Sequence, residues 1–193
     1  MDDAEFIVML RNQPHVRGMI HDTSNDVDRQ RQWIRDYLSR DNEYYWIGET
    51  LDGNPIGTNS LYNFNPKENR IESGRWVNLA DYEGSYSFSE AVLFKDFAFK
   101  VLGVSSVVCD IVSTNTQVIT FHKKLLREKE LDKISFLDGI GDTKVRTIWF
   151  EETIDTWKNN RKRLMKFCGD EECRKIFLIK EKDVIEQIDY LHI

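Results

Sequence analysis

The sequence predicts a mixed α/β domain with a central, mostly antiparallel sheet. Residues 72–127 contain the order strand, turn, helix, strand, helix, and the region before them holds β-prone runs separated by turn signals. A chain of 193 residues with 40% hydrophobic content can bury one core. We therefore expect one domain over residues 1–167 and a C-terminal extension, residues 168–193, that packs on it.

Two helices are expected at the start of the chain. The first covers residues 4–11, has an aspartate at its start, and ends before Pro14, because the residue before a proline resists helical geometry. The second begins after Asn25 or Asp26. Its apolar face is formed by Val27, Ile34, Tyr37 and Leu38.

Antiparallel strands are expected next, over residues 44–49 and 55–62, on either side of Asp52-Gly53. This dipeptide is typical of a hairpin turn. A turn over residues 63–69 leads into a third strand, residues 70–78.

The central segment continues with a turn over residues 79–87 and an amphipathic helix over residues 89–102, which Gly103 ends. The face expected to be buried holds Ala91, Phe94, Ala98, Val101 and Leu102, and the charged residues expected between them are Lys95, Asp96 and Lys100. A strand over residues 106–112 and a helix over residues 116–127 follow. A turn that opens onto a helix N-terminus favours anion binding.

The last elements predicted before the extension are a hairpin and a helix. Strands over residues 131–136 and 143–150 flank the turn at residues 139–142, and the helix begins at Asp155 or Thr156 and reaches Met165. Its basic residues are interpreted as a solvated face, with phosphate binding as the alternative.

Composition excludes several classes of function. A net charge of -6 argues against a nucleic-acid surface, and no apolar run approaches the length of a membrane span, so we expect a cytoplasmic protein without a membrane partner. The cysteines are Cys109, Cys168 and Cys173. Their odd number and spacing indicate a reducing compartment and no metal, while a disulfide or metal pair between Cys168 and Cys173 stays open.

Several motifs resemble the acetyl-CoA-binding core of the GNAT superfamily of N-acetyltransferases. They are Glu72-x-Gly74-x-Trp76, Gly84-Ser85, Ser89-Glu90-Ala91, Asp96-Phe97-Ala98-Phe99 and the segment from Asn115 to Leu125. Residues 10–14 and 32–34 resemble the branch that contains ribosomal-protein and amino-sugar acetyltransferases. The resemblance spans residues 3–150 and implies the GNAT-like fold, with a βαβα core.

The resemblance also implies the site. Acetyl-CoA is the expected cofactor, held by Trp76, Val77, Asn78, Gly84, Ser85, Tyr86, Ser87, Ser89 and Asn115. The expected catalytic residues are His122 as general acid, where many relatives have a tyrosine, Glu72 as acceptor of the amine proton, and Asn115. Arg11, Asn12, His15 and His21 are expected to line the acceptor pocket. The alternatives left open are a surface His122, a Glu72 paired with Arg70 or another base, and an Asn115 that only caps its helix.

The sequence departs from the family at three places. Glu83, Tyr86 and Phe88 stand where the pyrophosphate turn normally has Arg or Gln, Gly and a small residue, so loss of acetyl-CoA binding is an alternative. Leu126-Arg127 replaces a Gly-Phe pair, so the preceding helix is free to continue. The strand that usually precedes the first helix is missing, so either the start is truncated or another element, such as the C-terminal extension, completes the sheet.

We therefore expect an N-acetyltransferase that acetylates a small-molecule primary amine, with a nucleotide-linked amino sugar of surface-glycan synthesis as first acceptor. A protein N-terminal amine is the alternative acceptor. Two readings from other classes stay open: a degenerate, non-catalytic GNAT-fold binding module, and a regulatory domain that forms a homodimer through its C-terminal extension.

Overall fold

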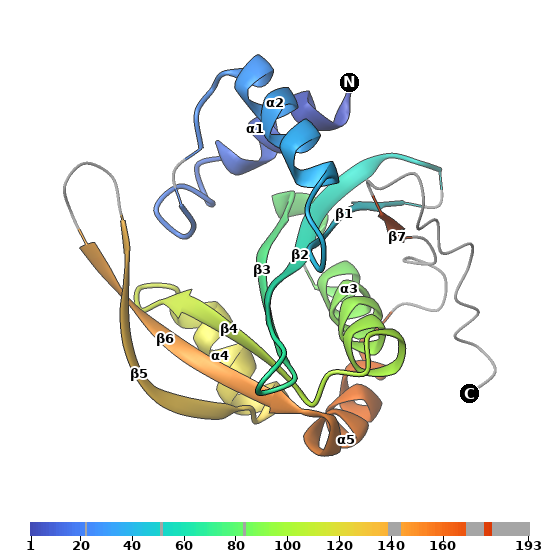
Figure 1. Ribbon diagram of the computed structural model, residues 1–193, viewed down its shortest axis with the longest axis vertical. Helices are drawn as coiled ribbons and strands as arrows, with labels where there is room; N and C mark the ends of the chain where they lie inside the picture. Colours follow the sequence, from blue (N-terminus) through green and yellow to red (C-terminus); the bar gives the residue numbers. More distant parts are fainter. Residues whose placement is uncertain (22, 51, 83, 139–143, 169–175, 179–193) are drawn as a thin grey trace.

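The computed structural model describes residues 1–21, 23–50, 52–82, 84–138, 144–168 and 176–178. One seven-stranded sheet has the order β5-β6-β4-β3-β2-β1-β7, and β3 and β4 are its parallel pair (Figure 1). The predicted mixed α/β fold with a mostly antiparallel sheet is confirmed. The strands are β1 (Tyr44–Glu49), β2 (Pro55–Asn65), β3 (Arg70–Asn78), β4 (Ser106–Val112), β5 (Lys129–Asp138), β6 (Lys144–Thr153) and β7 (Ile176–Leu178).

Helices cover both faces of the sheet. They are α1 (Asp3–Arg11), α2 (Val27–Leu38), α3 (Ser85–Asp96), α4 (Thr116–Thr120) and α5 (Ile154–Leu164), with π-helical turns Phe97–Val101 after α3 and Phe121–Leu126 after α4. Strand β1 shows the two faces, because successive side chains of a strand point to opposite sides. Tyr45 and Ile47 belong to a cluster with α1 and α2, whereas Trp46 belongs to a cluster with α3, α5 and the two π-helical turns.

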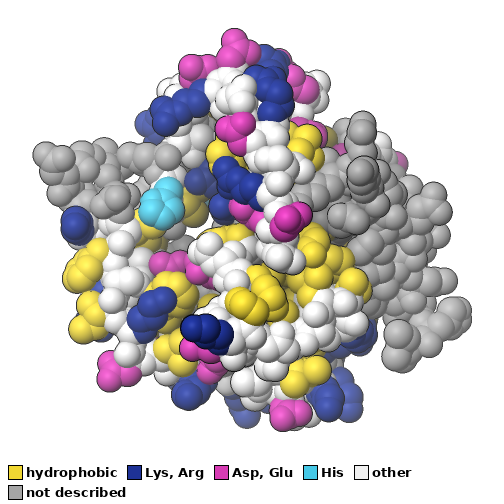
Figure 2. Space-filling model, viewed as in Figure 1, with side chains coloured by type: hydrophobic (Ala, Val, Ile, Leu, Met, Phe, Trp, Pro, Cys, Tyr) yellow, Lys and Arg dark blue, Asp and Glu magenta, His cyan; other side chains and the backbone are white. Residues whose placement is uncertain are grey.

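The helices at the start of the chain form as predicted. Asp2 caps α1 in a reciprocal capping box with Glu5, and Asp26 caps α2 by accepting hydrogen bonds from two backbone amides. Tyr37 is buried against the sheet, but Leu38 is largely exposed, which corrects its placement on the apolar face. Basic and acidic side chains intermingle over these two helices at the top of the view in Figure 2.

Helix α3 differs from its prediction in two ways. It begins at Ser85, four residues earlier than expected, so the turn is shorter. The π-helical turn that follows shifts the helical register, because its hydrogen bonds skip one more residue than those of an α-helix. Val101 is therefore 58% exposed, while Lys95 and Asp96, predicted between the apolar positions, are buried.

The end of the second core helix also required correction. Arg127 adopts the left-handed conformation, with φ of 55°, and takes the capping position that glycine usually fills. The helix therefore does not continue into Glu128, and β5 begins at Lys129. This places the Glu128 side chain inside the molecule.

The far edge of the sheet is completed by the C-terminal extension. Strand β7 pairs antiparallel with β1 through Trp46↔Leu178, Ile47↔Phe177 and Gly48↔Ile176. Another element, from the predicted C-terminal extension, thus occupies this edge of the sheet. Residues 169–175 and 179–193, with Cys173, lie outside the described residues, so the packing of the whole extension stays a prediction.

The remaining elements are longer than the sequence indicated. Strands β5 and β6 extend beyond their predicted bounds, and the turn predicted at residues 139–142 lies outside the described residues. Helix α5 is capped by Thr153, not by Asp155 or Thr156, and Met165 lies largely exposed after its end. Within the described parts of the chain, no helix has the length and apolar character needed to cross a bilayer.

Candidate active site

A cleft opens where β3 and β4 separate. The two parallel strands pair only at Arg70↔Ser106, Ile71↔Val107 and Glu72↔Val108, and beyond these positions they diverge. The cleft has a volume of about 700 Å³ and is lined by residues 73–78 of β3, residues 109–111 of β4, α4 with its π-helical turn, and the start of α3. Backbone groups of β3 beyond Glu72 are therefore available to a ligand that enters between the strands.

A bulge in β3 shapes the floor of this cleft. Arg75 has φ of 53°, and the pairing of β2 with β3 shifts register between Thr58 and Ser60. The hydroxyl of Thr58 donates to the carbonyl of Arg75 at 2.8 Å, and that of Ser60 donates to the carbonyl of Gly74 at 2.9 Å. These two bonds fix the bulge from the β2 side, so β3 presents a defined edge to the cleft.

The N-terminus of α3 borders the cleft and offers a site for an anion. Gly84 precedes the helix with φ of 90°, and no side chain caps the first-turn amides. A Cβ at Gly84 would meet no atom within 4 Å, so the backbone there is open to close approach. Free amides at a helix start, together with the helix dipole, favour a phosphate at this point.

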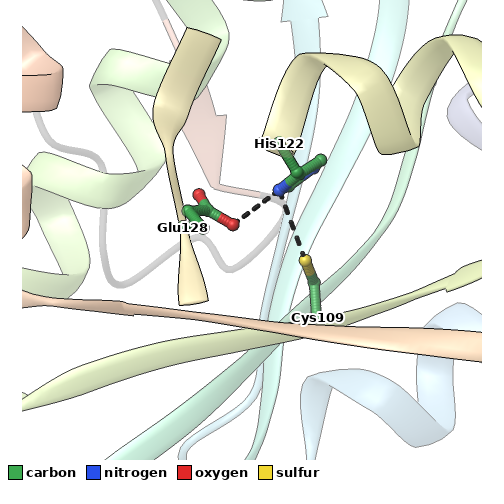
Figure 3. A group of neighbouring side chains, drawn as sticks. All are labelled: Cys109, His122 and Glu128. Atoms are coloured by element: carbon green, nitrogen blue, oxygen red, sulfur yellow. Dashed lines mark hydrogen bonds and ion pairs between the residues drawn. The ribbon is translucent and has the colours of Figure 1, made fainter. Parts of the chain in front are cut away.

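A buried polar network lies along one wall of the cleft (Figure 3). The Nδ1 atom of His122 lies 2.5 Å from a carboxylate oxygen of Glu128 and 3.9 Å from the sulfur of Cys109. The side chains come from β4, from the π-helical turn after α4 and from the residue just before β5. His122 is only 4% exposed, so the alternative of a surface histidine is wrong.

Lys95 joins this network to a second carboxylate. Its ammonium donates to Glu128 and to Glu152, each at 2.5 Å, and the amide of Asn160 also donates to Glu152. The ammonium holds the pKa of Glu128 well below its usual range, although burial opposes this. Burial raises the pKa of Glu152, which the same ammonium only partly offsets.

Cys109, His122 and Glu128 also have the side-chain types that bind zinc, and their ligand atoms lie within 4.8 Å of one another. Two observations argue against a metal centre. The ammonium of Lys95 already compensates the charge of Glu128, and burial raises the pKa of Cys109, which disfavours the thiolate that a metal needs. We interpret the group as a proton-transfer site.

Comparison with known proteins identifies the family. Residues 1–125 match the model of the acetyltransferase (GNAT) domain, which is more than half of the chain. This chain belongs to the GNAT family. GNAT acetyltransferases use acetyl-CoA, and their members include enzymes for small-molecule amines.

Solved structures of GNAT enzymes share the fold. FdhC, described as a nucleotide-linked sugar GNAT, superposes with a TM-score of 0.71 and 27% sequence identity, covering 86% of this chain and 90% of FdhC. Spermidine N-acetyltransferase from Vibrio cholerae, solved with CoA and spermine, gives a TM-score of 0.71 at 14% identity, covering 81% of this chain and 93% of that one. At that identity the likeness shows the fold alone. Comparison with curated protein sequences gives no significant match.

Several residues that the GNAT resemblance assigned to the cofactor line the cleft. They are Trp76, Val77, Asn78, Gly84, Ser87 and Asn115. Asn115 also caps α4 by accepting from the amide of Val118 at 3.2 Å. The amide of Asn78 donates to the hydroxyl of Ser87 at 2.8 Å and to the buried carboxylate of Glu90 at 2.7 Å.

Other predicted cofactor residues lie elsewhere. Ser89 is buried within α3 and Tyr86 packs edge-on against Tyr82, and neither lines the cleft. Ser85 is the first residue of α3, directly after Gly84, and its assignment to the cofactor stays a prediction, while Glu83 lies outside the described residues. Phe88 does line the cleft, where its ring stacks on Phe121 at 5.7 Å between centroids.

Glu72 does not line the cleft. Its carboxylate accepts a hydrogen bond from the amide of Asn63 at 3.2 Å, and Arg70 pairs with Glu68 instead, so the alternative pairing with Arg70 is wrong. Its catalytic assignment is untested, and this position places it behind the point where β3 and β4 diverge.

The predicted acceptor residues do not form one cluster. His15 lines the cleft, with its Nε2 atom 3.1 Å from the carbonyl of Asn78. Arg11 lines a separate cavity beneath α1 and α2. Asn12 caps α1 by donating to the carbonyl of Val8, and the exposed His21 contributes its carbonyl to Arg11.

No sequence pattern predicted a role in the site for Lys95, Cys109, Glu128 or Glu90. One signal was available for Lys95, which lies four residues after Ala91 and therefore on the same side of the helix. For Glu128 no local signal exists, because its burial follows from the left-handed conformation of Arg127.

Proposed function

We propose that this GNAT protein is a cytoplasmic acetyltransferase that moves the acetyl group of acetyl-CoA to the amine of a nucleotide-linked amino sugar in surface-glycan synthesis. The observation that carries the proposal is the juxtaposition of a buried His122–Glu128 pair with the cleft between the diverging strands β3 and β4. The fold and family establish the reaction class, and the acceptor is the proposed part.

The residues of the cleft fit acetyl-CoA, which supplies an activated acetyl thioester when bound. Gly84 and the first-turn amides of α3 would hold its pyrophosphate without a lysine. The edge of β3 beyond Glu72 would hydrogen-bond its pantetheine arm, with apolar contacts from Trp76, Phe88 and Phe121. The alternative that Tyr86 and Phe88 obstruct the pyrophosphate is weakened, because the open side of Gly84 keeps its backbone approachable.

His122 is proposed as the proton-transfer residue. The acceptor amine must lose a proton, and the departing thiol must gain one. Glu128 accepts from Nδ1 and so fixes the orientation of the ring, which leaves Nε2 as the nitrogen that exchanges a proton. In Figure 3 the remainder of the ring points away from Glu128 and Cys109. The ammonium of Lys95 also donates to Glu128 and so holds the carboxylate in place against the ring.

The acceptor class rests on sequence likeness and on the site. FdhC, the nucleotide-linked sugar GNAT, shares 27% of aligned residues over nearly the whole of both chains. The spermidine enzyme shares the fold at much lower identity, so it does not favour a polyamine acceptor.

Release of free thiol from acetyl-CoA tests the proposal. The purified protein is incubated with acetyl-CoA and one of three acceptors: a nucleotide-linked amino sugar, spermidine, or a peptide with a free N-terminus. We expect thiol release with the amino sugar, together with a product that carries one added acetyl group by mass spectrometry. Acetylation of the peptide or of spermidine in preference to the sugar would replace the proposed acceptor, and release with none would support a non-catalytic module.

A further inference from the structure

A second cavity lies on the opposite side of the sheet from α3, beneath α1 and α2. Its volume is about 260 Å³, and its lining includes the side chains of Arg11, Arg29 and Arg75. Arg75, at the β3 bulge, also lines the reaction cleft, so this residue borders both spaces. A cavity with three guanidinium groups in a protein of net charge -6 is unusual in composition, and its charge points to an anionic ligand.

Arg11 is a half-buried cation without an acidic partner among the described residues. Its Nε donates to the hydroxyl of Thr23 at 2.5 Å and its Nη2 donates to the carbonyl of His21 at 3.1 Å, so both partners are neutral. Burial lowers the pKa of Arg11, which reflects the cost of keeping this charge away from water. An anion in the cavity would offset that cost.

The other two arginines differ in how far they are neutralised. Arg75 pairs with Glu43 at 2.5 Å and lies over the ring of Tyr62. Because Glu43 neutralises its charge, Arg75 gives the cavity hydrogen-bond donors but little net positive charge. Arg29 is exposed in the first turn of α2 and has no ion pair in the parts of the chain that the structure describes. The one carboxylate in the lining, that of Asp26, is engaged by the amides that it caps. The net charge of the lining is therefore positive.

Tyr45 supplies an independent sign of a missing ligand. It lines the cavity, it is only 1% exposed, and its hydroxyl makes no hydrogen bond of standard geometry among the described residues, although the side chains of Arg11 and Thr58 lie near it. A buried hydroxyl without a partner costs about 1–3 kcal/mol, so native structures usually supply one. Burial raises the pKa of Tyr45, and the nearby guanidinium of Arg11 opposes that rise, so the two side chains lie close together in the lining.

We propose that this cavity binds the diphosphate of the nucleotide-linked acceptor, with Arg11, Arg29 and the hydroxyl of Tyr45 as its donors. The inference rests on the proposed function for its substrate class. Guanidinium groups match phosphate oxygens in a bidentate geometry, and two unpaired guanidinium groups match the charge of a diphosphate. Since Arg75 borders both spaces, a diphosphate held here leaves the attached sugar directed toward the reaction cleft.

Calorimetric titration with uridine diphosphate tests the cavity directly. Saturating CoA is present, so that the diphosphate-binding position at α3 is already filled. We expect Arg29→Gln and Arg11→Gln to weaken binding at least about tenfold, because a charge-assisted hydrogen bond contributes about 1.5–3 kcal/mol. Arg35→Gln is the matched control, since Arg35 lies on the exposed side of α2 and bonds only to Gln32 among the described side chains.

Steady-state kinetics separate this inference from the proposed function. In Arg29→Gln we expect KM for the nucleotide-linked sugar to rise about tenfold, while KM for acetyl-CoA and kcat stay the same. Sugar acetylation with an unchanged KM in Arg29→Gln would overturn the subsite and leave the function standing. Loss of uridine diphosphate binding in Arg29→Gln, in a protein that acetylates no sugar, would support the subsite and overturn the function. Equal binding by all variants would overturn the subsite.

Discussion

Replacement of Lys95 by methionine tests the buried network through stability. The ammonium is 3% exposed and lies between Glu128 and Glu152, which are themselves buried, so its removal leaves two carboxylates facing each other without a cation. Loss of one partner from a buried ion pair costs about 3–5 kcal/mol. For a chain of this length, each kcal/mol lowers Tm by about 2–4 °C, so we expect a decrease of about 10 °C.

Lys100→Met is the matched control for thermal unfolding followed by circular dichroism. Lys100 pairs with Asp96 one helical turn earlier at 3.1 Å, but its side chain is 43% exposed, so water already screens the pair. We expect its loss to cost at most about 1 kcal/mol. A variant that also carries Glu128→Gln and Glu152→Gln should regain most of the lost stability, because no buried charge is then left unpaired.

The pH dependence of the Lys95→Met deficit has a defined sign. In the native protein the ammonium keeps the pKa of Glu128 low, so this carboxylate contributes stability above its ordinary pKa and loses it as the pH falls. Without the ammonium, burial raises the carboxylate pKa values, and protonation relieves the repulsion. The difference in Tm between native protein and variant should therefore shrink from pH 8 to pH 5. An equal decrease for Lys95→Met and Lys100→Met at pH 8 would refute the reasoning.

Three further predictions follow from individual side chains. His122→Gln should lower kcat at least about tenfold, or 1.4 kcal/mol of barrier, with an unchanged calorimetric Kd for CoA; an unchanged kcat would remove His122 from the mechanism. Burial raises the pKa of Glu90 to about 7, so the native protein should lose about 3 kcal/mol of stability as the pH rises from 4.5 to above 7. Glu90→Gln should abolish that loss when the free energy of unfolding is measured by denaturant titration at pH 5 and pH 8. An equal loss in the native protein and in the variant would contradict the assignment. Arg127→Gly should raise Tm by about 2 °C, because glycine adopts φ of 55° without strain, and a lower Tm would show that the arginine side chain matters more.

The elements that the sequence predicted well have local signals. Helices α1 and α2 begin at aspartates that cap them, and the strands from β1 to β4 lie between turn residues. The start of α3 was misplaced by four residues because its cap, Gly84, offers no side-chain oxygen that marks an N-terminus.

The interior of the candidate site could not be read from local patterns. Lys95 contacts Glu128 and Glu152, which lie 33 and 57 residues further along the chain. The residues next to Lys95 in the sequence therefore do not indicate whether its side chain is buried or exposed to solvent. The π-helical turn after α3 moves Val101 out of the core, and periodicity based on an α-helix cannot anticipate that shift. The GNAT resemblance placed His122 and Asn115 at the cleft, which physical patterning alone did not do.

Calorimetric titration of the purified protein with acetyl-CoA tests the central claim most directly, because every step of the proposed function requires that the cleft between β3 and β4 holds this molecule. We predict one binding site with a micromolar Kd, despite the aromatic residues at the start of α3. Absence of binding at millimolar acetyl-CoA would contradict the acetyltransferase account.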